Sequence, residues 1–348
     1  NRRKDITLKM TNEALHMVET ECNLNNEKAI VLKKMGWHAG VIGIVASRIK
    51  EIYSRPAIII AMEDAEGKGS CRSIPGFDMV DALNECREHL IGFGGHPIAA
   101  GLTIGGKIPF TGTFANFSTS RVYDQIRQSI AYSNKNVKIC ASHAGVTLGE
   151  DGATHQILED IGLMKMLPGM TVINTCDYNQ TKAATKAIAD YDGPVYLRFG
   201  RPKVANFTED DQDFQIGKAV HLYEGTDVSI IATGHLVWEA IQAAVELNEK
   251  GISAEVINIH TIKPLDEEAV IASAKKTGCV VTAEEHNFLG GLGESVARTL
   301  ASHHPTPQEF VATEDCFGES GTPAQLMEKY GLNAAAIVKA AEKAIKRK

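Results

Sequence analysis

The chain has 348 residues, 44% of them hydrophobic and 23% charged, which is enough apolar material for two or three globular domains of ordinary size. Its longest apolar runs, such as residues 56–62, fall far short of the roughly 20 residues of a membrane helix, and no signal peptide opens the chain, so we expect a cytoplasmic protein without a membrane partner. The formal net charge of -7 falls on residues 107–348, while residues 1–106 contain 13 Lys+Arg and 13 Asp+Glu. Neither part has the large positive charge that is typical of nucleic-acid-binding proteins.

The first hundred residues follow an α/β pattern. Hydrophobic periodicity predicts helices at residues 11–21, 41–53 and 79–90, and strands at residues 29–33 and 57–61. The residues 66–69 (EGKG) predict a turn. We place the end of this first domain at residue 104.

Three motifs in this domain follow one another in a characteristic order. Residues 36–48 read GWHAGVIGIVASR, residues 67–78 read GKGSCRSIPGFD, and residues 93–101 read FGGHPIAAG. Residues 1–104 resemble the DHH-associated domain of RecJ-like 5'-3' single-strand-specific exonucleases. The chain opens at Asn1 inside what looks like a linker helix, so we interpret this part as a fragment. The hydrolytic metals of that family are held by a preceding DHH domain, so the resemblance implies DNA binding without hydrolysis.

Four residues of this domain are candidate contacts for single-stranded DNA: Arg72, Gly94, Gly95 and His96. A guanidinium, an imidazole and glycine-exposed backbone amides suit a phosphate group. The alternative is a glycine turn beside a packed helix. Both interpretations stay open.

Beyond Lys107, short apolar runs alternate with helical segments, which favours parallel sheets with right-handed crossovers. The expected strands are residues 108–112, 137–141, 171–175, 194–199, 228–233, 254–259 and 279–283. The polar, acidic residues 204–225 are expected to be a linker between domains at residues 105–203 and 226–348. The predicted fold class is α/β, with a small domain followed by two domains that have largely parallel sheets.

From residues 98–117 (IAAGLTIGGKIPFTGTFANF) to its C-terminus, the chain resembles the separately encoded C-terminal subunit of a split bacterial transketolase. The resemblance implies a pyrimidine-binding domain that lacks its first strand and helix, followed by the transketolase C-terminal domain. The residues 98–104 fit both families' patterns, so we interpret the chain as a chimera of two cut domains. The downstream context predicts a helix at this junction.

Phe114 and Phe117 stand three positions apart after the expected strand at residues 108–112. By itself such a pair indicates core packing. Aromatic rings can also stack on a flat heterocycle, and the resemblance implies that both rings hold the aminopyrimidine of thiamine diphosphate.

A glycine-rich loop with two histidines and two carboxylates follows the expected strand at residues 137–141. This loop, residues 143–156, reads HAGVTLGEDGATHQ. Open α/β sheets bind ligands at such strand ends, and imidazoles hydrogen-bond hydroxyl groups and transfer protons near neutral pH. The resemblance implies that His143 and His155 are catalytic and that Asp151 binds substrate.

Two arginines follow the next strand, in residues 197–202 (LRFGRP). Either Arg198 or Arg201 could bind a sugar phosphate through two guanidinium nitrogens, with a solvated charge as the alternative. The resemblance implies that Arg201 is the phosphate ligand. Residues 282–294 (TAEEHNFLGGLGE) resemble a hallmark of the family's last domain, in which we interpret the acidic pair as structural or as part of assembly.

Two parts of the family's catalytic apparatus are missing from the sequence. No GDG motif for Mg²⁺ and the cofactor diphosphate occurs, so the resemblance implies a separately encoded N-terminal subunit, in a heterotetramer or with a dimer of this chain. Gly92 replaces the glutamate that activates the cofactor. Because general acid–base catalysis contributes about 10²- to 10⁴-fold, we expect impaired activity. Seven scattered cysteines without a CxxC pair predict no metal site.

The sequence leaves three functions open. The leading hypothesis is thiamine-diphosphate-dependent transfer of a two-carbon ketol unit between sugar phosphates, as in the pentose phosphate pathway. The alternative is a nucleic-acid-binding fragment of a RecJ-like exonuclease. The third is an inactive chimera.

Overall fold

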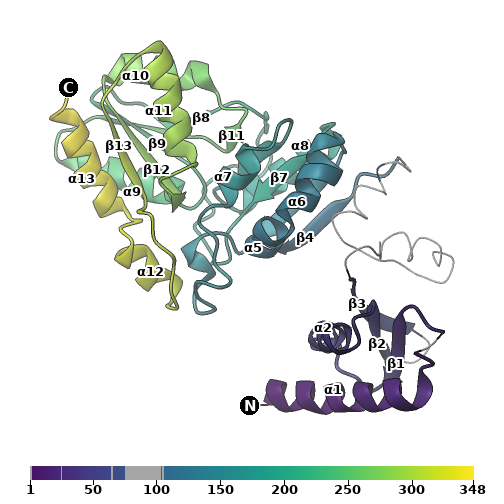
Figure 1. Ribbon diagram of the computed structural model, residues 1–348. Helices are drawn as coiled ribbons and strands as arrows, with labels where there is room; N and C mark the ends of the chain where they lie inside the picture. Colours follow the sequence, from purple (N-terminus) through teal and green to yellow (C-terminus); the bar gives the residue numbers. More distant parts are fainter. Residues whose placement is uncertain (1, 25, 64–65, 75–102, 104–105) are drawn as a thin grey trace. The chain divides into compact units, whose positions relative to one another are not determined.

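The structure is a computed structural model that describes residues 2–24, 26–63, 66–74, 103 and 106–348. The chain divides into two compact units, residues 1–93 and 94–348, which Figure 1 colours from purple to yellow along the sequence. Several predictions lie outside the described residues: the helix at 79–90, all but one residue of the helix at 98–104, and Gly92, Gly94, Gly95 and His96.

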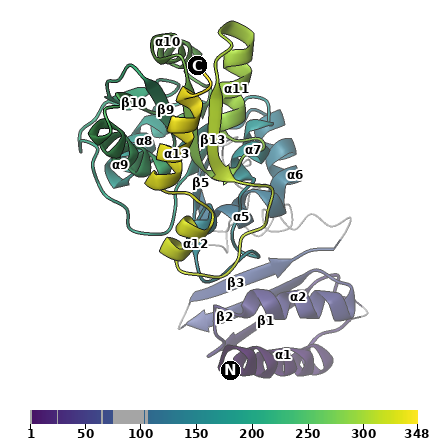
Figure 2. The same ribbon diagram turned by 90° about the vertical axis from the view of Figure 1, so that its left-hand side faces the viewer.

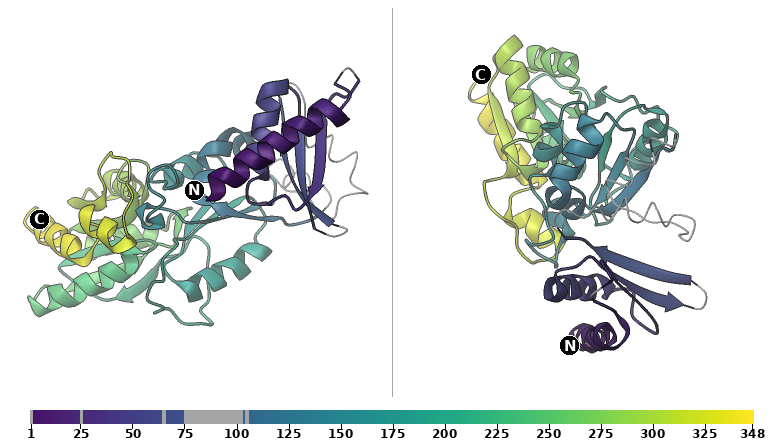
Figure 3. Two further views of the ribbon diagram at one scale, coloured as in Figure 1. Left: turned by 90° about the horizontal axis from the view of Figure 1, so that it is seen from below. Right: turned by 45° about the vertical axis from the view of Figure 1, so that its right-hand side comes forward.

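The first unit contains a three-stranded sheet with two helices packed on it. The central strand β2 is parallel to β1 and antiparallel to β3. Ala14, Val45 and Ile59, from the two helices and the sheet, are fully buried in one core, and Figure 3 shows α1 and α2 as neighbouring helices. The elements are α1 (Arg2–Glu21), β1 (Ile30–Met35), α2 (Ile42–Tyr53), β2 (Ala57–Glu63) and β3 (Glu66–Arg72).

The turn predicted at residues 66–69 is instead the first half of β3. Gly67 pairs with Met62, and Gly69 pairs with Ile60, across the antiparallel strand β2. A Cβ atom added at Gly67 would lie 2.6 Å from the side chains of both Ile60 and Met62. The prediction was wrong because glycine here leaves room for cross-strand side chains and does not mark a turn.

The first sheet of the second unit has the strand order β11-β6-β7-β5-β4. Strands β4 to β7 are parallel, and β11 lies antiparallel to β6 at one edge. A π-helical segment (Ile126–Tyr132) and α7 cover one face, and α8 covers the other. The elements are β4 (Phe110–Phe114), α5 (Ala115–Ser118), α6 (Tyr123–Gln125), β5 (Lys138–Ser142), α7 (Asp160–Lys165), β6 (Thr171–Asn174), α8 (Tyr178–Asp190), β7 (Val195–Arg198) and β11 (Thr261–Lys263).

The second sheet of this unit has the strand order β13-β12-β9-β10-β8, all parallel except the edge strand β8. Helices α9 and α13 pack on one face, and α10 and α11 pack on the other (Figures 1 and 2). The elements are β8 (Val220–Tyr223), β9 (Val228–Ala232), α9 (Leu236–Glu249), β10 (Ala254–Asn258), α10 (Glu267–Thr277), β12 (Val280–Asn287), α11 (Leu292–His303), β13 (Gln308–Thr313), α12 (Pro323–Lys329) and α13 (Ala334–Ile345).

The predicted α/β fold with largely parallel sheets is confirmed, and each of the seven strands expected beyond Lys107 is present within a few residues. Residues 204–225, expected as a linker, include the edge strand β8, and Phe214 within them is only 8% exposed in the core beneath α8. None of the helices in the described ranges is both long and apolar enough to cross a bilayer.

Candidate functional site

The carboxyl ends of β4 and β5 bring Phe114 and His143 together. The two strands are parallel neighbours with Phe114 opposite Ser142, so the residue after Ser142 reaches the phenyl ring. The rings of Phe114 and His143 stack, with centroids 3.9 Å apart and planes at 12°. His143 has a positive φ of 60°, a backbone conformation that is unfavourable for most non-glycine residues. Its Nδ1 atom lies 2.9 Å from Ser142 Oγ.

Phe117 extends this pair into a cluster of rings. Its ring lies 5.7 Å from that of Phe114 at an angle of 9°, and it meets the His155 ring edge-on at 5.4 Å. The Arg121 guanidinium lies 4.4 Å from the centre of the Phe117 ring, within cation–π distance. The structure therefore brings together four residues that the sequence had singled out: Phe114, Phe117, His143 and His155.

Arg201 and Asp151 add charges to the same site. Arg201 is exposed, donates to the Leu148 carbonyl oxygen at 2.6 Å and pairs with Glu150 at 3.2 Å. Asp151 is exposed on the loop. Burial lowers the pKa of His143, the positive charge of Arg201 lowers this pKa further, and Asp151 acts in the opposite direction. His143 is therefore a neutral imidazole near pH 7 and can accept a proton.

Arg198, the other arginine suggested as a phosphate ligand, is only 2% exposed. Its Nε donates to Asp160 Oδ2 at 2.7 Å, and its Nη2 donates to the backbone oxygen of Glu285 at 2.9 Å. Tyr196 donates its hydroxyl to the same Asp160 oxygen at 2.5 Å. Burial raises the pKa of Asp160, but the Arg198 charge keeps this pKa below its ordinary value. Arg198 is occupied by this buried network, so it is excluded as a phosphate ligand.

The two glutamates near the end of β12, Glu284 and Glu285, bind two different segments of the chain. Glu284 accepts the backbone N–H groups of Leu292 and Gly293, each at 2.7 Å, and so satisfies the first turn of α11. Glu285 accepts the backbone N–H of Thr147 at 2.7 Å. Both carboxylates are buried and accept these backbone hydrogen bonds within the chain.

His235 is a neighbour of the site that sequence reasoning missed. Its Nδ1 lies 3.2 Å from Glu285 Oε2 and 3.4 Å from Thr147 Oγ1. Burial raises the pKa of Glu285, but the hydrogen bond with His235 brings this pKa below its ordinary value. A single histidine ahead of α9 carries no periodic or motif signal, so only the folded chain shows this contact.

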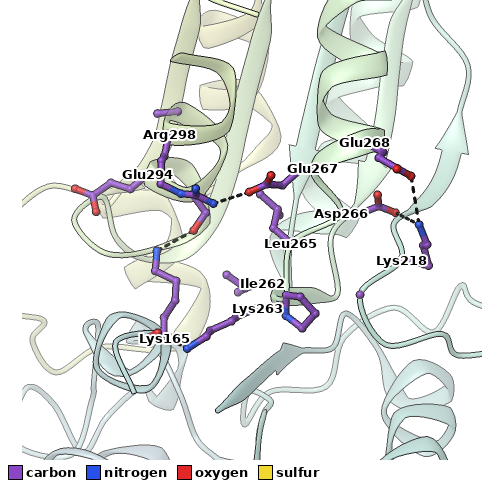
Figure 4. Close-up of a pocket in the computed structure, with 14 residues that line it drawn as sticks. Lys165, Lys218, Ile262, Lys263, Leu265, Asp266, Glu267, Glu268, Glu294 and Arg298 are labelled. Carbon is purple, nitrogen blue, oxygen red and sulfur yellow. Dashed lines mark hydrogen bonds and ion pairs between the residues drawn. The ribbon is translucent and has the colours of Figure 1, made fainter. Parts of the chain in front are cut away.

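A cavity of about 430 Å³ borders the loop, between residues 153–159 and 315–318. A larger cavity of about 930 Å³ lies beside β11 and the first turns of α10 and α11 (Figure 4). There Lys218 pairs with Asp266 and Glu268, and Arg298 pairs with Glu267. The charges around the larger cavity thus pair mainly with one another, and we assign them a structural role.

In the first unit, Arg72 lies at the end of β3. Its Nε donates to Ser47 Oγ at 3.0 Å, and its Nη1 donates to Ser70 Oγ at 3.2 Å. A Cβ atom added at Gly43, in the first turn of α2, would lie 3.0 Å from Arg72 Nη2. The exposed guanidinium is thus held beside the start of a helix, where an anion is favoured.

Within the residues that the structure describes, no three His, Cys, Asp or Glu side chains converge to hold a metal ion. Six cysteines of this part are free thiols.

The ring cluster and the polar loop lie at the carboxyl edge of one parallel sheet, beside a second such sheet, and this edge is where open α/β folds bind ligands. Three family models match the chain. The transketolase pyrimidine-binding domain matches residues 93–206, the transketolase C-terminal domain matches residues 217–337, and the DHHA1 domain matches residues 26–110. The first and the third of these overlap at residues 93–110.

Known proteins extend this likeness. The chain is 48% identical over 251 residues to the 6-deoxy-6-sulfo-D-fructose transketolase subunit SqwH of Clostridium sp. (strain MSTE9), covering 72% of this chain and 78% of that protein. It is 41% identical over 251 residues to one subunit of the apulose-4-phosphate transketolase of Phocaeicola vulgatus, covering 72% and 80%. A solved split gene transketolase, described as an inactive beta4 tetramer, is 36% identical with a TM-score of 0.69, covering 98% of both chains. The chain belongs to the transketolase family, and this membership implies thiamine diphosphate as cofactor.

Proposed function

We propose that residues 98–348 act as the C-terminal subunit of a split transketolase, which transfers a two-carbon ketol unit between sugar phosphates. The observation that carries this proposal is the meeting of Phe114, Phe117 and His143 with Arg201 at one sheet edge. Flat rings can stack on a heteroaromatic cofactor, and imidazoles can transfer protons to and from hydroxyl groups. A guanidinium can form paired hydrogen bonds with an anionic substrate group. The family relatives described above include enzymes named for a sulfo-sugar and a sugar phosphate, both of them anionic.

The residues present suit thiamine diphosphate. Phe114 and Phe117 offer nearly parallel flat faces at the sheet edge, and such faces would hold the aminopyrimidine ring. When bound, the cofactor supplies the carbanion chemistry that cleaves a carbon–carbon bond beside a carbonyl. We assign Mg²⁺ and the diphosphate to a separately encoded N-terminal subunit, because the sequence contains no GDG motif. We propose a heterotetramer or an assembly on a dimer of this chain, in keeping with the tetramer named for the similar structure.

The polar residues have separate roles in this proposal. His143, neutral near pH 7, accepts and returns a proton at a sugar hydroxyl, and His155 does so at a neighbouring hydroxyl. Asp151 accepts a hydrogen bond from a third hydroxyl. Arg201 binds the phosphate at the far end of the sugar, exchanging its contact with Glu150 for a stronger anion.

The test combines the chain with an N-terminal transketolase subunit, thiamine diphosphate, Mg²⁺, xylulose 5-phosphate and ribose 5-phosphate. We expect slow turnover, because Gly92 stands where the family has its activating glutamate. Gly92→Glu should then accelerate turnover by about 10²-fold or more. Arg201→Gln in the same background should raise KM. Absence of turnover in the Gly92→Glu variant would overturn the enzymatic proposal in favour of an inactive chimera.

A second function is proposed for the first unit, the binding of single-stranded nucleic acid. The DHHA1 match and the exposed Arg72 beside Ser47 and Ser70 support it. We expect a fluorescent single-stranded oligonucleotide to bind in a salt-dependent manner, and Arg72→Ala to reduce the salt slope by about 1. Arg127→Ala, which removes an exposed arginine from the second unit, is the control. Equal affinity of both variants would argue against this function.

We also propose that the chain is a chimera joined within residues 98–104, which the overlap of two family models supports. A single long DNA read across the codons for residues 85–117 tests this. One molecule that contains both halves establishes a genetic fusion, whereas halves that never share a molecule exclude it.

A further inference from the structure

The C-terminal domain places a buried histidine–glutamate contact beside the loops that carry the substrate-binding candidates. Glu285, near the end of β12, and His235, just before α9, approach to 3.2 Å, and their side chains are 3% and 10% exposed. We propose that this pair is a positioning device that fixes the loop of residues 143–156 against the loop that carries Arg201. It would thereby set the spacing between the groups that bind the two ends of the substrate, and in this respect it rests on the proposed function.

Glu285 controls the first of these loops. Its Oε1 accepts the Thr147 backbone N–H at 2.7 Å. A Cβ atom added at Gly145 would overlap the same Oε1 atom, so the carboxylate occupies the space directly beside the loop backbone. The loop can approach this closely only with glycine at this position. His143, two residues before Gly145, is therefore tied to a carboxylate of the other sheet.

His235 controls the second loop. A Cβ atom added at Gly200 would overlap His235 Cε1, so the imidazole packs directly on the backbone that precedes Arg201. Since each partner of this contact packs on a different loop, the contact between them holds the two loops at a fixed separation. Arg201 itself completes the arrangement, because it donates to the Leu148 carbonyl oxygen at 2.6 Å.

Arg198 also contacts one member of this pair, Glu285. It donates from Nη2 to the Glu285 backbone oxygen at 2.9 Å and thereby ties the end of β12 to the end of β7, the strand that leads to Arg201. A buried polar contact of this kind is weak support for stability, because desolvation of the polar groups offsets much of its gain. The contact lies between the two loops, and a glycine faces each of its two side chains. A role in positioning these loops accounts for this placement.

The test reads the geometry of the loops without requiring catalysis. Because the Arg201 charge helps to lower the pKa of His143, loosening the loops should raise this pKa toward about 6.5, as measured by NMR titration of the His143 ring. The resonance is identified by its loss in His143→Gln. We expect the rise in Glu285→Ala and, as an independent second variant, in His235→Gln. Glu285→Gln, which keeps an acceptor for the Thr147 N–H, should restore most of the lowered value.

Glu284→Ala is the matched control. Glu284 is the neighbouring residue on the same strand and is equally buried, but its carboxylate binds the start of α11. The Glu284→Ala substitution should lower the melting temperature and leave the His143 titration unchanged. An unchanged titration in both Glu285→Ala and His235→Gln, or an equal shift in Glu284→Ala, would overturn the proposal.

A kinetic measurement connects the positioning device to function. In the reconstituted enzyme, Glu285→Ala should raise KM for the sugar phosphate by about tenfold with a smaller change in kcat, because binding depends on the spacing of the loops. If the titration shifts as expected but no variant turns over substrate, the proposed enzymatic function fails while the positioning role stands. If turnover occurs but the His143 titration is unchanged in the variants, the proposed enzymatic function stands and the positioning role fails.

Discussion

The imidazole of His143 lies face to face with the ring of Phe114, with centroids 3.9 Å apart. Burial is the main cause of the lowered pKa of His143, and Phe114 is the ring that covers it. We expect Phe114→Leu to raise this pKa toward about 6.5, because a smaller side chain readmits water to the imidazole. NMR titration of the His143 ring measures the effect. Phe117→Leu should change it less, since Phe117 stacks on Phe114, and a larger shift in this control would contradict the assignment.

Two loop charges act on the same pKa with opposite signs. Removal of a positive charge in Arg201→Gln makes the protonated imidazole easier to form and should raise the His143 pKa, whereas Asp151→Asn removes a negative charge and should lower it further. Both shifts should shrink as ionic strength rises, because both charges are exposed. Titrations of the two variants at low and high salt provide the measurement. Shifts of equal sign would show that the loop is arranged differently.

His260 should make the second unit sensitive to acid. Its ring is 1% exposed and packs 4.1 Å from the Phe214 ring, and burial lowers its pKa to about 4. Between about pH 6.5 and 4, the unfolded chain binds a proton that the folded chain does not. The free energy of unfolding therefore decreases as the pH is lowered through this range. The loss from this group should reach about 2 kcal/mol at pH 5.

The measurement for His260 is denaturant unfolding at pH 7 and pH 5. His260→Gln should be less stable at pH 7, because a packed ring is lost, but its stability should fall less between the two pH values. His303→Gln, at an exposed histidine in the last turn of α11, is the control and should keep the wild-type slope. A wild-type slope in His260→Gln would assign the acid sensitivity to other groups.

The parts of the fold that follow a local pattern could be predicted from the sequence. Buried runs such as residues 228–233 mark parallel strands because both faces of such a strand are covered by helices. The three-residue strand β11 could not be predicted, because it is too short for a pattern and pairs with β6, far away in the sequence. The same limit applies to β8, whose alternating exposure resembles a polar loop.

The candidate site was partly predictable for a similar reason. Phe114 and His143 each follow a strand, and neighbouring parallel strands end at the same edge, so their meeting follows from the expected topology. Arg198 could not be told apart from Arg201 by sequence, although the structure places the first inside β7 and the second beyond it. The contact of Glu285 with Thr147 joins two sheets and leaves no local trace.

The contact between Gly145 and Glu285 allows a stability test by double-mutant cycle. Gly145→Ala introduces a Cβ atom that overlaps Glu285 Oε1 at a backbone φ of 78°, so it should cost more than about 2 kcal/mol in the wild type. In the Glu285→Ala background only the backbone strain at φ 78° and ψ -169° remains, on the order of 1–3 kcal/mol, and the overlap cost of about 1–3 kcal/mol disappears, so the two substitutions should couple strongly. Gly149→Ala is the control: its φ is 93°, but the nearest atom to its Cβ is Pro323 Cδ at 3.4 Å. Its cost in denaturant unfolding should be the same in both backgrounds, and additivity of Gly145→Ala with Glu285→Ala would show that the carboxylate does not lie against the loop.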